Sequence, residues 1–243
     1  MTPFTVSSLT STVLRSPSAL VDHPDPRHAL ATFGPRLLAI GLCGMALFGL
    51  VVGSYRGGVQ NLYAALKLPL LLLVPVVVGL PAVRALHAAC DVEAPHARLA
   101  LAAVVGMART GVLAAACGPV LWLLYSIGID YHLAILCMAG ALALVGMPGL
   151  ATVVRSLPAG GRHRGVASLL SLVLLGSIGA QTGWLLRPFI ARPRAEVSFI
   201  RPIESDVFSS LSTAFASARG RYDGWDAQAE GFLARERDQE AQP

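Results

Sequence analysis

The chain has 243 residues, of which 54% are hydrophobic and only 14% are charged, and its formal net charge is +5. An ordinary soluble domain carries about 25% charged residues, so this composition excludes a water-soluble globule and indicates a protein that lies largely in lipid. The positive charge does not indicate nucleic-acid binding, because the arginines border apolar stretches without a basic groove or an aromatic platform.

Residues 1–35 are rich in Ser, Thr and Pro and contain no long apolar stretch. This composition predicts a mostly disordered cytoplasmic tail, in which one short helix could form. So long a polar segment does not fit the start of a usual signal peptide. The first apolar stretch therefore predicts an uncleaved membrane helix.

Five apolar stretches follow, and a helix needs roughly 17 to 25 residues to cross a bilayer core. They are residues 37–54, 68–88, 103–126, 132–154 and 166–186. The second contains Pro69, Pro75 and Pro81, which predict a kink. The predicted fold class is all-α, a polytopic membrane helix bundle of about five transmembrane helices over residues 36–189.

The distribution of Lys and Arg predicts the orientation, because cytoplasmic loops are enriched in both. With the N-terminus inside, the inner segments hold nine arginines, whereas the two outer loops hold only Arg56 and Lys67. This pattern predicts a multi-pass membrane protein with a cytoplasmic N-terminus and an outer C-terminus. The arginines after the fifth stretch then lie outside, but the rule weighs short loops more than tails.

Small residues four positions apart suggest where the helices pack. Gly49, Gly53 and Gly57 share one helix face at the end of the first stretch, and Gly179 and Gly183 share one in the fifth. Such spacing lets membrane helices approach closely. We expect these faces to serve packing within the bundle, with contacts between copies of the chain as the alternative.

Two polar side chains interrupt the later stretches. Gln181 needs a partner in hydrocarbon, so it either joins helices or lines a substrate path. Arg109 either reaches the cytoplasmic phosphates, if its helix starts near Ala103, or lies inside the membrane, if the helix starts near Leu99. The apolar stretches contain no acidic partner for it, which argues against a proton relay.

Residues 55–67 mix polar and apolar side chains and predict an interfacial or re-entrant segment. Gln60 and Lys67 are its candidate functional residues, because with Gln181 they could surround a polar cavity.

Residue types typical of zinc sites occur at His87, Cys90, Asp91 and His96, but their spacing matches no standard zinc motif. Motifs of metalloproteases, serine hydrolases and phosphate-binding loops are missing. The sequence therefore predicts no enzyme, no metal site and no cofactor.

The stretch GWLLRPFI ends the fifth span and predicts an anchor at the membrane surface. Trp184 suits the acyl boundary, and Arg187 suits the phosphate level. Pro188 ends the helix, and Phe189 can dip back into the interface. Arginines that alternate with prolines follow and could contact a partner: Arg192, Arg194 and Arg201.

Beyond this anchor, residues 190–218 predict an extended Arg/Pro segment followed by an outer interfacial helix that starts near Ser205. Residues 219–243 predict a polar C-terminal tail, either disordered or carrying a small partner-binding face.

The chain resembles a loosely defined group of bacterial polytopic membrane proteins over roughly residues 36–215. The resemblance rests on the GxxxG of the first span, Gln60, the Lys67-Leu68-Pro69 step, and GAQTGWLLRPFI followed by VSFIR. A weaker, mostly topological likeness is to Yip1-type proteins, and it implies five spans and a cytoplasmic N-terminus. The first likeness implies a location in the bacterial inner membrane, and neither likeness implies catalytic residues.

The expected function is that of a non-enzymatic scaffold, assembly factor or accessory subunit of a membrane complex. Its expected partners are membrane lipids and either other membrane subunits or further copies of the chain. The alternative is a small transporter or channel with a polar path near Gln60, Lys67 and Gln181.

Overall fold

The computed structural model describes residues 6–92, 95–129, 131–156 and 163–190, all of which belong to one compact unit, Met1–Arg201. The described residues form seven helices and no strand, so the all-α prediction is confirmed. The helices are α1 (Val6–Arg15), α2 (Pro17–Val21), α3 (Pro26–Ser54), α4 (Val59–Ala89), α5 (His96–Ser126), α6 (Tyr131–Arg155) and α7 (Arg164–Leu185).

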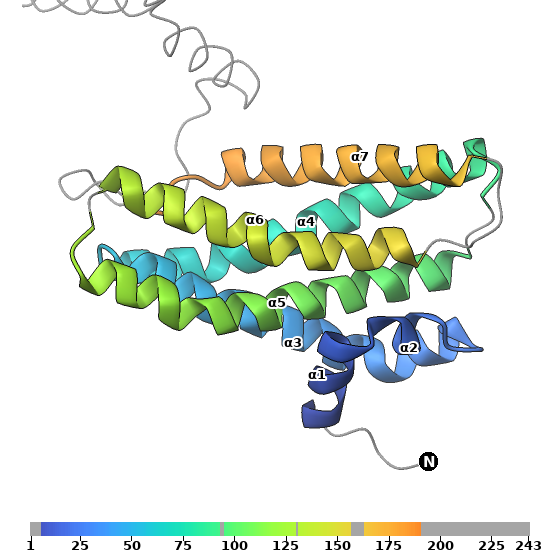
Figure 1. Ribbon diagram of the computed structural model, residues 1–243, viewed down its shortest axis with the longest axis horizontal. Helices are drawn as coiled ribbons and strands as arrows, with labels where there is room; N and C mark the ends of the chain where they lie inside the picture. The colour runs from blue at the N-terminus through green and yellow to red at the C-terminus, as the bar shows by residue number, and fades with distance from the viewer. Residues whose placement is uncertain (1–5, 93–94, 130, 157–162, 191–243) are drawn as a thin grey trace, which may run out of the picture. The chain divides into compact units, whose positions relative to one another are not determined.

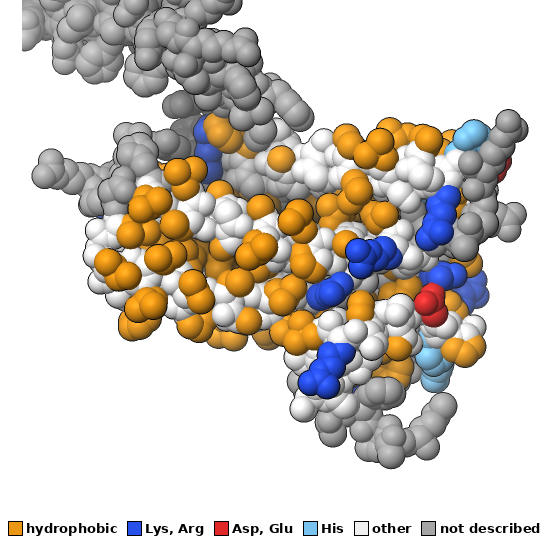
Figure 2. All heavy atoms as spheres, viewed as in Figure 1, with side chains coloured by type: hydrophobic (Ala, Val, Ile, Leu, Met, Phe, Trp, Pro, Cys, Tyr) orange, Lys and Arg blue, Asp and Glu red, His pale blue; other side chains and the backbone are white. Residues whose placement is uncertain are grey.

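Helices α3 to α7 are each long and apolar enough to cross a membrane, which confirms the predicted count of five spans. Large apolar side chains on their outer surfaces are exposed, among them Leu136, Leu144 and Leu169. Figure 2 shows hydrophobic side chains spread over much of one face, whereas most Lys and Arg side chains gather toward one end. Apolar surface of this extent belongs in lipid, so the chain is a multi-pass membrane protein.

The five long helices pack in a ring rather than in sequence order (Figure 1). Helix α3 packs closely on both α4 and α5, α5 packs on α6, and α4 packs on α7. Helices α6 and α7 touch only slightly. The tightest contacts therefore centre on α3.

The N-terminal region differs from the mostly disordered tail that its composition predicts. Residues 6–15 and 17–21 are helical, and α3 begins well before the apolar stretch. Leu9 and Val13 lie one turn apart on α1 and are fully buried, in a cluster with Leu101 and Val105 of α5. A few apolar residues on one helix face suffice to dock these short helices, although the mean composition is polar.

Residues 55–67 are neither re-entrant nor a separate interfacial segment. The chain turns at Gly57 and Gly58, which both have positive φ, and α4 then runs without interruption from Val59 to Ala89. Only the first part of the predicted segment is a loop. The prolines of α4 lie within this continuous helix.

Glycines make the closest contacts between helices. A Cβ on Gly49 would lie 2.5 Å from the Ala64 carbonyl oxygen of α4, and one on Gly53 would overlap the backbone of Asn61. The third glycine of this pattern, Gly57, has open space around it and serves the turn instead.

The glycines of α7 contact α4 less closely. A Cβ on Gly179 would lie 3.9 Å from Pro75 Cγ, and one on Gly183 would lie 3.5 Å from Leu71 Cδ1, which are ordinary van der Waals distances. Neither position requires glycine for space.

Two other close contacts at glycines, one between α3 and α5 and one between α5 and α6, do not follow from the predicted faces. A Cβ on Gly44 of α3 would overlap the backbone of Gly111 of α5, and one on Gly111 would overlap Gly41. Similarly, a Cβ on Gly106 of α5 would lie 2.7 Å from the carbonyl oxygen of Gly149 of α6. Helix backbones touch at these points, which is the geometry that small residues permit in membranes.

Asp25 caps the N-terminus of α3. Its Oδ1 accepts hydrogen bonds from the backbone N–H groups of Arg27 and His28, both at 3.1 Å. The bond from His28 is the main cause that holds the pKa of Asp25 below its ordinary value of 3.8. The ionised carboxylate therefore stabilises this helix end.

This cap predicts a pH dependence of local stability at the start of α3. Because the folded pKa is depressed, the stabilisation is present above the ordinary pKa of 3.8 and is lost as pH falls through the folded value. Amide hydrogen exchange at His28 and Ala29 should be roughly two- to fivefold faster in Asp25→Ala than in wild type at neutral pH. In Asp25→Asn, which caps without titrating, protection relative to Asp25→Ala should persist in acid where wild type loses it. Equal acid responses of wild type and Asp25→Asn would contradict this assignment.

Candidate functional site: a buried junction between α4 and the end of α7

Two polar side chains lie on the inner face of α4, where Gln60 and Lys67 are separated by about two helical turns. Both are completely buried. Ala64 and Leu68 lie on the same face and are also buried, so the two polar groups are surrounded by apolar side chains. Burying an amine costs several kcal/mol unless hydrogen-bonding partners compensate for the lost water.

The compensating partners come from the end of α7. Gln60 Nε2 donates to the carbonyl oxygen of Phe189 at 2.5 Å and, at 3.4 Å, to that of Pro188. Lys67 Nζ donates to the same Pro188 oxygen at 2.9 Å. Helix α7 ends at Leu185, so these carbonyls belong to the chain after the helix and are free to accept. We call this set of contacts the junction.

The anchor residues occupy a different place from the one predicted. Phe189 and Ile190 do not dip into the membrane interface, because both are buried in the main apolar core. Their neighbours in this core include Phe48 of α3 and Met138 of α6. Burying two such side chains contributes roughly 3 to 6 kcal/mol. The junction therefore combines two kinds of interaction. The side chains of Phe189 and Ile190 are buried in the core, and the neighbouring backbone carbonyls accept hydrogen bonds from α4.

Trp184 and Arg187 stabilise the approach to the junction. The Arg187 guanidinium lies 3.5 Å from the centre of the Trp184 ring, a cation–π contact within the last turn of α7 and its continuation. This contact holds the arginine against the indole. The residues that enter the core, Phe189 and Ile190, come shortly after it in the chain.

Arg109 is neither near a helix end nor free of partners. It lies in the middle of α5, since that helix begins at His96, earlier than the sequence suggested. Its Nη1 donates to the Pro148 carbonyl oxygen at 3.3 Å and to Thr152 Oγ1 at 3.2 Å, so it ties α5 to α6.

Gln181 does not join the junction. In the described structure no hydrogen bond connects it to Gln60 or Lys67, and its Oε1 is buried without a partner among the described residues. The three residues of the expected polar path are thus not assembled by direct contacts.

A second polar contact joins α4 and α7 near their other ends. His87 Nε2 lies 2.9 Å from Ser171 Oγ, and that hydroxyl donates to Ala167. The serine proton is therefore committed, and His87 Nε2 must carry the proton that it donates. Among the described residues, no group of three or more His, Cys, Asp or Glu side chains could hold a metal ion, and Asp91 and His96 are exposed.

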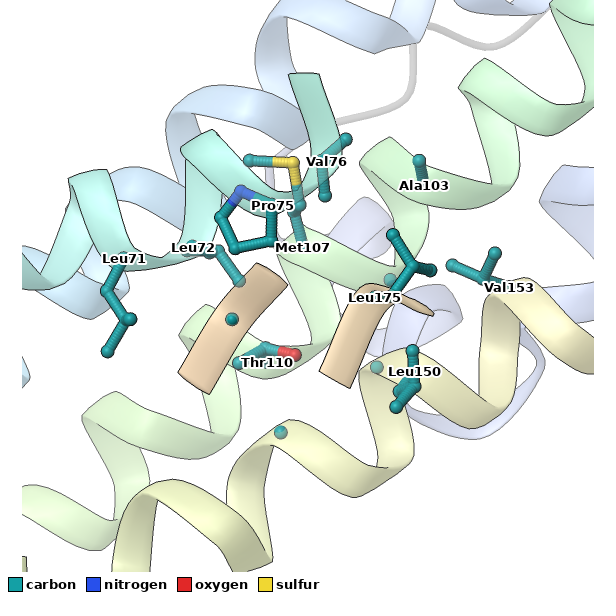
Figure 3. Close-up of a pocket in the computed structure, with 14 residues that line it drawn as sticks. Leu71, Leu72, Pro75, Val76, Ala103, Met107, Thr110, Leu150, Val153 and Leu175 are labelled. Atoms are coloured by element: carbon teal, nitrogen blue, oxygen red, sulfur yellow. The ribbon is translucent and has the colours of Figure 1, made fainter. Parts of the chain in front are cut away.

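An apolar cavity of about 200 Å³ lies between α4, α5, α6 and α7. Figure 3 shows its walls, with Leu71 and Pro75 on α4, Met107 and Thr110 on α5, and Leu175 on α7. Thr110 is the one polar side chain that lines it, and none of the three residues of the expected path does. A cavity of this chemistry suits packing or an apolar occupant rather than a hydrated path.

The sequence singles out most members of the junction but does not show that they contact each other. Gln60 and Lys67 were expected at a cavity, and Pro188 and Phe189 at a surface anchor, whereas the structure brings all four together. The available signal is the one lysine of the sequence, which borders an apolar stretch while the spans contain no acid, since such a lysine needs carbonyl partners if it is buried. The predicted Arg192, Arg194 and Arg201, the interfacial helix and the polar tail lie outside the described residues.

The described residues form a membrane helix bundle in which the junction holds the chain that follows α7. The resemblance to bacterial polytopic membrane proteins, which rests mainly on GWLLRPFI, and the topological likeness to Yip1-type proteins stay predictions. Comparison of the chain with known protein families, curated proteins and solved structures gives no match.

Proposed function

We propose that the protein is a non-enzymatic scaffold or accessory subunit of a membrane complex, and that the residues after the junction contact its partner. The observation that carries this proposal is the hydrogen bonding of Gln60 and Lys67 to the carbonyls of Pro188 and Phe189. Side chains engaged in this way hold a chain segment in place.

The attachment of residues 187–190 to the bundle favours a role in presenting the residues that follow to a partner. A partner binds more tightly to a segment that is already ordered, because less conformational entropy is lost on binding. The arginines that follow, Arg192, Arg194 and Arg201, would then start from a fixed point on the bundle. The apolar character of the cavity supports this role over solute transport.

The proposed location is a bacterial inner membrane with the N-terminus in the cytoplasm. The orientation is supported by the distribution of Lys and Arg. The segments on the same side of the membrane as the N-terminus hold more arginines than the two loops on the other side, in line with the bias of cytoplasmic loops. Residues after the junction would then meet a partner on the outer side.

The proposal is tested by mild detergent extraction of the tagged protein at native expression, followed by quantitative mass spectrometry of co-purified proteins. We expect a companion in near-stoichiometric amount, reduced at least roughly tenfold in the triple variant Arg192→Gln, Arg194→Gln and Arg201→Gln, given the usual value of buried interfacial arginines. The matched control is the exposed triple Arg27→Gln, Arg36→Gln and Arg84→Gln, which removes the same charge from the opposite side.

A solitary protein under these conditions would contradict the proposal. Solute flux in proteoliposomes that depends on Lys67 and Gln181 would then favour the transporter.

A further inference from the structure

A second cavity, of about 310 Å³, lies where α1 and α2 meet α5 and α6. Three arginines from three different helices line it: Arg15 from the last turn of α1, Arg109 from α5 and Arg155 from the end of α6. We call it the arginine cavity. The docking of α1 through Leu9 and Val13 brings Arg15 to this place, so the cavity exists only because the N-terminal helices are folded.

The charge of the arginine cavity is not balanced within the described part of the chain. Its one acidic lining residue, Asp22, forms an ion pair at 2.6 Å with Arg98 of α5. In residues 6–92, 95–129, 131–156 and 163–190, no carboxylate pairs with Arg15, Arg109 or Arg155. Three like charges around one cavity repel each other unless an anion lies between them.

The remaining lining groups suit a phosphate. Ser16 also lines the cavity and its side chain makes no capping hydrogen bond to α2, whereas the hydroxyls of Thr152 and Ser156 donate within α6 to the carbonyl oxygens of Pro148 and Val153. Arg109 is held in position by its bonds to Pro148 and Thr152, and its buried Nε has no partner among the described residues. Guanidinium groups match the geometry of phosphate oxygens.

The surface beyond the arginine cavity indicates which phosphate it receives. Val120 lies about three helical turns beyond Arg109 on the same face of α5, and Leu144 lies equally far from Arg155 on α6. Both are 62% exposed, and since α5 and α6 are antiparallel they lie in the same direction from the arginines. Exposed apolar side chains farther along the same two helices that hold a basic cavity fit a lipid, whose acyl chains continue from its phosphate.

We propose that the arginine cavity binds the phosphate of an anionic glycerophospholipid, with the acyl chains along the exposed faces of α5 and α6. A soluble phosphate shares the headgroup chemistry but would gain nothing from these apolar faces. This inference does not rest on the proposed scaffold function, since it concerns a different set of residues.

The test places the full chain in nanodiscs that contain equal amounts of phosphatidylglycerol and phosphatidylcholine, and measures the retained lipid by native mass spectrometry. We expect wild type to retain phosphatidylglycerol selectively. The variant Arg15→Gln with Arg155→Gln changes two exposed side chains and should retain it roughly 10- to 30-fold more weakly, at the usual effect of a basic group near an anionic headgroup. Arg109→Gln should weaken retention as well, provided that its melting temperature matches that of wild type.

The control variant is Arg36→Gln with Arg84→Gln, which removes the same charge from exposed positions that do not line the arginine cavity. Unchanged selectivity in this control supports the site. Equal losses in the two double variants would overturn it, because they would show a general attraction of the basic end to anionic lipid. Absence of selectivity in wild type would also overturn it, and displacement of the lipid by inorganic phosphate would assign the cavity to a soluble ligand instead.

Discussion

Gly44→Val is expected to destabilise the bundle by more than about 3 kcal/mol, beyond the usual range for overpacking of a core. The reason is that a side chain at this position meets the backbone of Gly111 in α5, and a backbone cannot rotate aside as a flexible side chain does. Helices α3 and α5 form the most extensive contact of the bundle, so separating them affects the whole membrane domain. The apparent melting temperature in detergent should fall by roughly 6 to 12 °C or more.

The matched controls are Gly140→Val in α6 and Gly176→Val in α7. A Cβ at either position meets no atom within 4 Å. These controls therefore measure how much valine itself destabilises a helix when it makes no steric clash. Both controls should melt within a few degrees of wild type, because a surface substitution usually changes stability by about 0.5 kcal/mol or less. A normal melting temperature for Gly44→Val would mean that α3 and α5 do not approach as closely as described.

The double variant Gln60→Leu with Lys67→Met is expected to release residues 187–190 from the core. Both replacements keep the side-chain volume nearly constant but remove the donors to the Pro188 and Phe189 carbonyls. Each buried acceptor left without a partner costs about 1 to 3 kcal/mol, so the released state should gain at least roughly tenfold in population.

Release can be measured by labelling a cysteine at position 190 with a membrane-impermeant maleimide, after replacement of Cys43, Cys90, Cys117 and Cys137. Ile190 is 3% exposed, so Ile190→Cys should react slowly in the otherwise wild-type chain and at least roughly tenfold faster in the double variant. Gln181→Leu is the control, because no hydrogen bond links Gln181 to this segment in the described structure. Continued protection in the double variant would show that Phe189 and Ile190 hold the segment by apolar burial alone.

The amino-acid composition and the length of the apolar stretches determined the membrane character of this protein. The low content of charge and five long apolar stretches were enough to predict an all-α bundle with five spans, since transfer of a helix into lipid depends mainly on its own side chains. Even so, the helices extend beyond the apolar stretches. The composition of the N-terminal region predicts a mostly disordered tail with at most one short helix, whereas α1 and α2 are both docked, because their stability comes from the face of α5 that they cover.

Contacts between distant residues were decided only by the tertiary structure. Gly44 and Gly49 look alike in the sequence, and nothing local shows that the first meets α5 and the second meets α4. The same holds for Lys67, whose partner oxygen lies on a residue 121 positions away. Such pairs depend on how two helices cross, and the crossing is set jointly by the side chains of both helices. The sequence by itself therefore determined which segments enter the membrane, whereas the junction and the arginine cavity required the packed bundle that brings their parts together.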